Sequence, residues 1–515
     1  MRKISRRASL VYGAVAFPAW LLFGAGVLEA APAPASALER QWLATLPGGK
    51  LELATLLSAA KRLSGTYRGI QAMEGSAEAS ELRVSALYRP SLSMQLQKSD
   101  SQLEPASPFE PSRIESSAFG LGLEQKFLTG TSLSFDSRFG PTALGFSPRS
   151  GSPGAVEFQE TRFDLNLQQS LWRDSFGISS RLGYRIGFLG AEVLRQQRRA
   201  EVEAFALALI GEFYEAWLAQ SRVRDAEDTL ARSLRIEKMT RVRAARGTAE
   251  RPDILEAEAA RVSAELALRE AREHLLERWL KLAVAIKLEP ELAAQVDPAK
   301  LPLVLDALDP APDSLCLKAG NNKGSAALAH ALASQRRWEA EAERAELDKR
   351  PDLKLRGRLS ANGIDARLSE SASEAARGKH LGWEVSLRLQ VPLGQLEAEG
   401  QRREARSQEI RATAEAEALA DAERVRWGIR CKEIARRAAD LKHLKENALR
   451  QEERGRLEEN RFSLGRIRLN DVTRAEEEAL ISKARLRLEE VSLRRALWSH
   501  RELSGSVAET FEALP

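Results

Sequence analysis

The sequence predicts a mixed α+β membrane protein in which barrel strands contributed by several chains are joined to very long helices. Three observations lead to this prediction. An apolar N-terminal segment follows a basic start, as in exported proteins. Short runs alternate apolar with polar residues, as half-buried strands do. Long stretches rich in Ala, Glu, Leu and Arg carry heptad repeats, which are typical of coiled-coil helices.

The N-terminus has the pattern of a secretory signal peptide, which we expect to span residues 1–30. A mostly apolar stretch from residue 8 to 28 is followed by small residues near Ala30, and it is preceded by the basic residues Arg2, Lys3, Arg6 and Arg7. Beyond this segment no stretch offers about 20 consecutive apolar residues. A membrane crossing by the mature chain would therefore require strands.

The region after the signal peptide predicts first a helix and then strands. Residues 51–87 have helical spacing, and Pro90 ends this pattern. Alternation of apolar and polar residues begins at Leu92, Met94 and Leu96, and it returns at residues 119–123, 131–137 and 163–167. We expect the Ser-, Pro- and Gly-rich segments 101–117 and 140–155 to be exposed loops. The second and third runs form either an additional barrel hairpin or a long ribbon outside the membrane.

A long helical hairpin follows the strands. A heptad seam predicts a helix over about residues 190–246, with members Val202, Leu209, Ala216, Val223 and Leu230. Gly247 and Pro252 interrupt it. A second helix then carries one apolar stripe, formed by Leu255, Ala259, Val262, Leu266 and Leu276.

The same succession then occurs again, which indicates an internal duplication. A helix over 324–350 stops at Pro351, alternating residues follow, and LQVPLG at 389–394 matches LQQSLW at 167–172. A helix over about 398–463 precedes a last helix with the stripe Val472, Ala479, Leu486 and Leu493. Four residues around the first helical turn recur at one constant separation: Gly247, Asp253, Ala257 and Glu258 match Gly465, Asp471, Ala475 and Glu476.

These patterns divide the chain into consecutive segments. We expect a signal peptide at 1–30, an N-terminal segment with the first helices at 31–87, barrel strands at 88–171, a helical hairpin at 172–288, a linker at 289–323, a helix at 324–350, barrel strands at 351–393, a second helical hairpin at 394–506 and a C-terminal tail at 507–515.

The strand count determines the expected assembly. Backbone groups in hydrocarbon must be paired within the protein, so spanning strands have to close into a barrel. Four to six strands in one chain are too few, because about eight form the smallest membrane barrels. Several chains must therefore share one barrel, while the long charged helices extend into water.

Composition argues against other classes of protein. The 78 basic and 73 acidic residues nearly cancel and alternate along the helices, so no basic stripe for nucleic acid exists. The five histidines are scattered without metal-ligand spacing, and no catalytic motif stands out. Gly120 and Gly122 form a short Gly-x-Gly within an alternating run, not a phosphate loop. Cys316 and Cys431 lie far apart, and two free thiols are favoured over a disulfide.

At this point the sequence resembles the TolC-like outer-membrane efflux and secretion channel family. The resemblance rests on FSLGRIRLNDVTRAEEE at 462–478, RGTAERPDILEAEAAR at 246–261 and the LQQSLW and LQVPLG joints. It implies a homotrimer with a shared transmembrane β-barrel in outer-membrane lipid, an α-helical periplasmic barrel and an equatorial layer built from the linker and terminal regions. It also implies a passive exit duct of a tripartite efflux or type I secretion system, served by a periplasmic adaptor and an inner-membrane transporter, with no enzymatic activity or cofactor.

The resemblance also indicates site residues at the ends of the two hairpins. It implies a periplasmic gate at Asp471 and Asp253, with Arg474 in place of a second acidic residue. It implies adaptor contact through the tip residues Gly247, Thr248, Leu464, Gly465 and Arg466. Other interpretations remain: the two glycines permit tight turns, and the two aspartates stabilise helix starts.

One alternative from another class is a periplasmic coiled-coil scaffold or adaptor without a barrel. It accounts for the signal peptide and the helices. It does not account for four or more alternating runs at matching places in the two halves of the chain.

Overall fold

A computed structural model of the 515-residue chain describes residues 50–102, 104, 110–146, 155–288, 293, 296–306, 324–391, 393–394 and 396–515. The predicted signal peptide at 1–30 lies outside the described residues, as does most of the predicted linker at 289–323.

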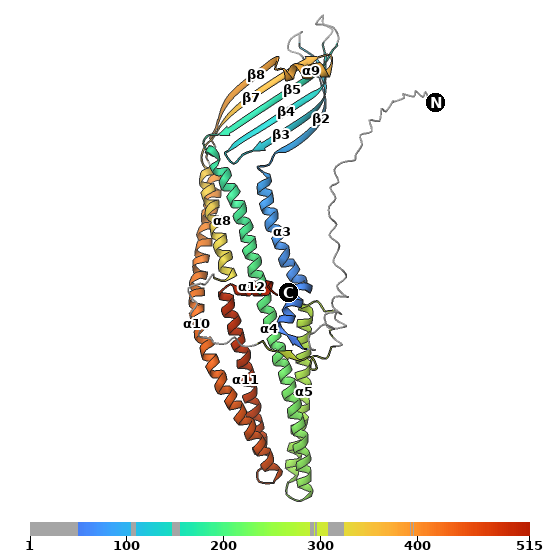
Figure 1. The fold of residues 1–515 in the computed structure, drawn as a ribbon, viewed down its shortest axis with the longest axis vertical. Coiled ribbons are helices and arrows are strands. Elements are labelled where there is room, and N and C mark those ends of the chain that lie inside the picture. Colours follow the sequence, from blue (N-terminus) through green and yellow to red (C-terminus); the bar gives the residue numbers. More distant parts are fainter. Residues whose placement is uncertain are drawn as a thin grey trace, which may run out of the picture. The chain divides into compact units, whose positions relative to one another are not determined.

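An antiparallel sheet of six strands lies at one end of the long helices (Figure 1). Its spatial order is β2-β3-β4-β5-β7-β8, so four strands come from the first half of the chain and two from the second. The strands are β2 (Ser91–Gln102), β3 (Arg113–Lys126), β4 (Thr131–Gly145), β5 (Ala155–Ser170), β7 (Asp352–Asp365) and β8 (His380–Gln390). Among the described residues the outer strands β2 and β8 pair neither with each other nor with a further strand, so each leaves one edge open.

The sheet has one apolar and one polar face, because side chains alternate along each strand and the register aligns like with like. The apolar face includes the aligned triplet Leu123, Phe135 and Leu165, and Trp383 on β8 is 77% exposed. The polar face includes the aligned triplet Gly122, Asp136 and Asp164. In the single chain both faces are accessible, so the apolar one lacks the cover that a buried core would give it.

Two helices of equal length dominate the rest of the structure. The long helices are α4 (Ile178–Ala245) and α10 (Leu396–Ser463), with 68 residues each, and the helices that follow them are α5 (Arg251–Ala285) and α11 (Leu469–Leu503), with 35 residues each. We call α4–α5 the first hairpin and α10–α11 the second hairpin. Near the sheet, α3 (Gly65–Ala86) packs on α4, and α8 (Ala326–Asp348) lies between α4 and α10 (Figure 1). Among the described helices, none is both long and apolar enough to cross a bilayer.

A smaller layer surrounds the middle of α4. It contains β1 (Leu51–Glu52), α2 (Leu53–Leu63), β6 (Leu303–Val304) and α12 (Ser506–Glu512). Strands β1 and β6 pair in parallel, Leu51 with Leu303. Phe511 of α12 is buried and meets the Tyr67 ring edge-on at 5.3 Å. The expected tail at 507–515 is therefore wrong: Val507, Ala508 and Phe511 have helical spacing, and burial of their side chains fixes this segment as a helix.

Several expected boundaries are also wrong. The segment 51–87 contains the two helices α2 and α3, in agreement with its helical spacing, but it begins as strand β1, and Ser64 separates the helices and caps α3 by accepting from the Tyr67 amide. The first long helix begins at Ile178 and not near 190. Residues 113–117 and 140–145, expected in loops, belong to β3 and β4, because pairing with neighbouring strands extends beyond the apolar alternation. Both strands lie within the sheet and form an additional hairpin there.

A short helix interrupts the strands of the second half, where the sequence analysis places only strands. Helix α9 (Leu368–Ala376) lies between β7 and β8 and packs on β5 and β7. The hydroxyl of Ser371 donates to the Gly363 carbonyl at 2.8 Å, and its oxygen lies 2.9 Å from the Thr161 hydroxyl, with which it shares a hydrogen bond. Thr161 belongs to the apolar face, so α9 covers one end of that face.

The predicted apolar stripes of α5 and α11 differ in how far they are buried. The predicted stripe of the last helix faces inward, with Val472, Ala479 and Leu493 buried. The predicted stripe of α5 faces outward instead, and Leu255 is 57% exposed. The residues of α5 that are buried are Ala257, Ala264, Leu275, Trp279, Leu282 and Ala283.

The cysteines also differ from the expectation. Cys431 on α10 is disulfide-bonded, whereas the sequence analysis favours two free thiols. Cys316, the other cysteine of the chain, lies outside the described residues. Sequence spacing contains no measure of the distance between two thiols in the fold, and this distance determines whether they can bond.

Candidate functional sites at the helix tips and on the sheet

Each hairpin turns at a glycine whose backbone has the left-handed conformation. Gly247 has φ of 73° and Gly465 has φ of 74°. The amide of Thr248 donates to the carbonyl five residues earlier at 2.9 Å, and the amide of Arg466 does the same at 3.0 Å. This is the hydrogen bond of a Schellman helix end, in which a residue without Cβ avoids steric strain. We call residues 246–250 tip 1 and residues 464–468 tip 2.

The predicted gate aspartates lie in the first turn of the helix after each tip. A carboxylate oxygen of Asp253 accepts from the Glu250 amide at 2.9 Å, and one of Asp471 accepts from the Arg468 amide at 3.2 Å. Each aspartate thereby satisfies a backbone donor that the helix start leaves free. Both residues thus have a structural role in the single chain.

Arg474 is exposed, and its guanidinium bonds to Glu478 at 3.3 Å, one turn further along α11. No ion pair joins Arg474 to Asp471 within the part of the chain that the structure describes. Asp471 is also exposed. The start of α11 therefore presents one negative and one positive side chain to the surroundings.

The two tips lie next to each other and enclose a groove of about 660 Å³. Five of the eight predicted site residues line it, namely Gly247, Thr248, Asp253, Gly465 and Arg466. The other three do not. Leu464 is 60% exposed, and Asp471 and Arg474 lie outside the lining.

An apolar cluster joins the hairpins directly behind the tips. It contains Ile236, Ala257, Phe462, Leu469 and Val472, all buried. These residues come from all four helices of the two hairpins, so the cluster sets the spacing between the tips.

One contact at the tips was not predicted from the sequence. The guanidinium carbon of Arg243 lies 4.6 Å from the ring centre of Phe462, and Arg243 donates to the Phe462 carbonyl at 3.4 Å. This cation–π contact ties the end of the first long helix to the end of the second. The only available signal was an arginine shortly before Gly247 and an aromatic residue shortly before Gly465.

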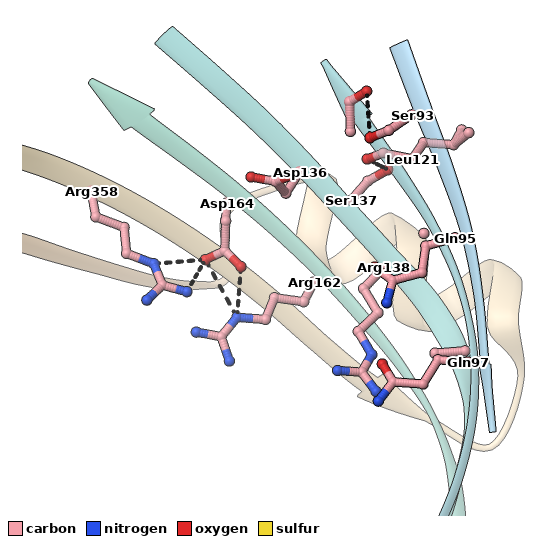
Figure 2. A pocket seen from close by; sticks show the side chains of 13 residues that line it. Ser93, Gln95, Gln97, Leu121, Asp136, Ser137, Arg138, Arg162, Asp164 and Arg358 are labelled. Atoms are coloured by element: carbon pink, nitrogen blue, oxygen red, sulfur yellow. Dashed lines mark hydrogen bonds and ion pairs between the residues drawn. The ribbon is translucent and has the colours of Figure 1, made fainter. Parts of the chain in front are cut away.

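The polar face of the sheet carries a second group of charged side chains (Figure 2). Asp164 on β5 is held by two guanidiniums, that of Arg162 at 3.0 Å and that of Arg358 at 2.9 Å. They line a hollow of about 310 Å³, which we call the sheet hollow. Its other lining residues are Ser93, Gln95, Gln97, Ala118, Gly120, Leu121, Gly122, Asp136, Ser137 and Arg138.

Among the described residues, no three His, Cys, Asp or Glu side chains cluster so that they could hold a metal ion. The acidic side chains of the long helices instead form ion pairs along and between the helices, as Arg436 does with Asp440 at 2.8 Å. Such exposed pairs stabilise a helix modestly.

A sheet that continues into helices of 68 and 35 residues is a fold that this chain shares with solved outer-membrane channels of the TolC family. The chain superimposes on the outer membrane protein VceC of Vibrio cholerae with a TM-score of 0.63 and 14% identity, covering 88% of this chain and 96% of that one. It superimposes on the CmeC outer membrane channel of Campylobacter jejuni with a TM-score of 0.62 and 12% identity, covering 88% and 85%.

The MtrE outer membrane channel of Neisseria gonorrhoeae gives a TM-score of 0.59 at 14% identity, with 88% of each chain covered. No protein-family model and no curated protein sequence matches the chain. The resemblance noted in the sequence is therefore shown at the level of the fold.

Proposed function

We propose that the chain is one subunit of a homotrimeric outer-membrane exit duct in a tripartite efflux or type I secretion system. The observation that carries this proposal is the sheet: it has an exposed apolar face, a polar face and two open edges. A second chain can continue such a sheet at each edge by main-chain hydrogen bonding. Three copies would give about 18 strands, within the range of known membrane barrels.

The different polarity of the two sheet faces supports a duct. The apolar face would contact lipid, where exposed side chains such as Leu92, Met94 and Leu96 replace water by hydrocarbon at a gain in free energy. The polar face would line the water-filled interior. Trp383 on the apolar face would then be exposed to lipid, where its amphipathic ring suits the interface.

The exposed apolar stripe of α5 supports contacts between subunits in the helical part. Leu255, Val262, Leu266 and Leu276 are each at least 41% exposed in the single chain. A neighbouring subunit that packs against this stripe would bury it, as the heptad pattern of the sequence requires. The equal lengths of the two hairpins and their identical turns support an origin by duplication, which would give the tunnel wall a near-regular repeat.

The tips are the proposed site of adaptor contact and gating. Gly247, Thr248, Leu464, Gly465 and Arg466 are exposed at the far end of the helices from the sheet. A periplasmic adaptor would bind there and connect the duct to an inner-membrane transporter, which would supply the energy. The duct itself would need no catalytic residue and no cofactor.

Asp471 and Arg474, with Asp253, are the proposed constriction. In a trimer the exposed charges of Asp471 and Arg474 would be repeated around the axis as three negative and three positive side chains, so a purely cation-selective ring is not expected. Replacing Asp471 and Arg474 together by alanine should change single-channel conductance and ion preference in planar bilayers. An unaltered conductance and ion preference would exclude both from the constriction.

Fractionation tests the proposal as a whole. Outer-membrane extracts should contain the protein as a trimer-sized species that converts to the monomer on heating in detergent. Recovery as a soluble periplasmic protein would instead favour the coiled-coil scaffold or adaptor, which predicts no membrane-embedded sheet.

A further inference from the structure

The sheet hollow exists because of the Gly-x-Gly of β3. Gly120 pairs with Gln95 on β2 and with Arg138 on β4, so no side chain fills the space between these two polar residues. A Cβ on Gly122 would lie 2.6 Å from the Ser93 hydroxyl, which glycine avoids. The missing side chains leave a hollow of about 310 Å³ on the polar face, where Figure 2 shows it.

The charges around the sheet hollow do not balance. Three guanidiniums, those of Arg138, Arg162 and Arg358, line it together with two carboxylates, those of Asp136 and Asp164. Asp164 is already bonded to two of the guanidiniums. The side chain of Arg138 has no ion pair and no hydrogen bond in the part of the chain that the structure describes. The hollow therefore contains one cation whose charge no protein group neutralises by contact.

The strand register concentrates this positive charge in one place. Arg138 and Arg162 lie directly opposite each other on neighbouring strands. Like charges in such a pair destabilise a sheet unless something neutralises them. Gln95 and Gln97 of β2 line the same hollow, and Figure 2 shows Gln97 near the end of Arg138. Their amides can donate hydrogen bonds to an anion.

We propose that the sheet hollow is a binding site for the anionic group, a carboxylate, sulfonate or phosphate, of a solute that passes along the polar face. Arg138 supplies the free guanidinium, which suits the planar oxygens of such groups. Arg162 supplies the second charge, and Gln97 supplies amide donors. The inference deepens the proposed function, since it assumes that the polar face lines the duct, and it assigns that duct a preference for anionic cargo.

Conductance of the full-length protein in planar bilayers tests the site, with inorganic pyrophosphate as the probe. Pyrophosphate should block the wild-type channel, and Arg138→Gln should raise the concentration for half-block about fivefold, the value of one exposed ion pair. The double variant Arg138→Gln with Arg162→Gln should raise it further and shift the reversal potential in a salt gradient towards cations. The matched control is Arg388→Gln on β8, also on the polar face and without a partner among the described residues.

The outcomes separate this inference from the function on which it rests. A conducting channel that pyrophosphate does not block, or equal block in Arg138→Gln and Arg388→Gln, overturns the anion site and leaves the duct intact. A protein that forms no channel overturns the duct. Calorimetric titration of pyrophosphate into detergent-solubilised protein then decides the site on its own: the site requires binding that Arg138→Gln weakens and Arg388→Gln leaves within about twofold.

Discussion

The first and second hairpins share a backbone plan and differ in how their helices pack. Their helices have equal lengths of 68 and 35 residues, and both tips turn at a left-handed glycine followed by an aspartate that caps the next helix. The side chains packed between the two helices, however, differ in size and charge from one hairpin to the other. The shared backbone plan therefore requires the helix lengths and the turns, and it leaves the residues between the helices free to vary.

The first difference between the two hairpins concerns the residues that lie between their two helices, near the tips. In the first hairpin Glu237 is only 6% exposed and bonds to Arg261 at 2.9 Å. The residues at the equivalent positions of the second hairpin are Gly455 and Ala479, where a Cβ on the glycine would lie 4.0 Å from that of the alanine. Two long charged side chains in one hairpin thus correspond to two of the smallest residues in the other.

A second difference concerns charge. In the first hairpin Arg241 bonds to Glu258 at 2.9 Å. The equivalent residues of the second hairpin, Glu459 and Glu476, are both acidic. Burial raises the pKa of the Glu476 carboxyl, and the neighbouring Glu459 raises it further. Glu459 finds its partner in the first hairpin, where Arg235 lies 3.4 Å away. At these positions the first hairpin therefore pairs its own charges, whereas Glu459 of the second hairpin is paired with a residue of the first.

The largest expected effect comes from changing only one residue of the Gly455–Ala479 pair to its counterpart in the first hairpin. Gly455→Glu should destabilise the protein by about 3 kcal/mol, because it places a carboxylate in the buried contact between the two helices without its arginine. Adding Ala479→Arg should recover at least half of this loss. Urea unfolding followed by far-ultraviolet circular dichroism measures both. Gly428→Glu is the control, since Gly428 lies on the same helix with nothing within 4 Å of its Cβ position. Equal effects of Gly455→Glu and Gly428→Glu would show that the contact is not tight.

The next prediction concerns pH and compares Glu203 on α4 with its equivalent, Asp421 on α10. Burial raises the pKa of Glu203 to about 7 from 4.5, although its carboxylate accepts from the Ala326 amide. Asp421 is exposed and paired with Arg424 at 3.0 Å. The folded protein thus holds the Glu203 proton more tightly than the unfolded chain does. Stability from this group is present below pH 4.5 and is lost as pH rises to about 7.

Glu203→Gln should remove this dependence. Between pH 5 and pH 8 the wild type should lose about 2.5 kcal/mol more unfolding free energy than the variant. Thermal unfolding at several pH values measures the difference, and Asp421→Asn should leave the wild-type pH profile unchanged. Identical profiles for the wild type and Glu203→Gln would show that Glu203 ionises normally in the folded protein.

Substitutions at the two tips should have equal effects, since the plan requires the same turn in both hairpins. Gly247→Ala and Gly465→Ala should each destabilise by about 1 kcal/mol, because alanine is strained at positive φ. The two losses should agree within a few tenths of a kcal/mol. Gly211→Ala, inside α4 with free space around its Cβ position, is the control and should stabilise slightly. A loss at one tip alone would contradict the equivalence of the turns.

The smallest expected effect tests the ion pair by which Glu459 of the second hairpin depends on Arg235 of the first. Arg235→Ala removes the exposed partner of Glu459, so the amides of tip 2 should exchange hydrogen about twofold faster. The equivalent change in the second hairpin, Glu453→Ala, should have no effect there. Hydrogen–deuterium exchange with mass spectrometry resolves the two tips separately. Unchanged exchange at tip 2 in Arg235→Ala would show that the apolar cluster behind the tips suffices.

The sequence predicted the features that depend on neighbours within a few residues. Gly247 and Gly465 are at turns because positive φ favours glycine, and Asp253 and Asp471 lie in first turns because a short acidic side chain reaches a backbone amide. The alternation of apolar and polar residues predicted β2 and β7, because side chains on a strand have a period of two wherever one face differs from the other. The constant spacing of these residues indicated the two equivalent hairpins.

Tertiary structure alone decided which neighbour each surface meets. The stripe of Leu255, predicted as a seam, faces outward because the periodicity of a helix defines its apolar face and not the element that covers it. Helix α12 is ordered by Tyr67, which is far away in the sequence. The bonding of Cys431 and the unneutralised Arg138 also depend on distances between remote segments. Such distances are set when the whole chain packs, and no local pattern contains them.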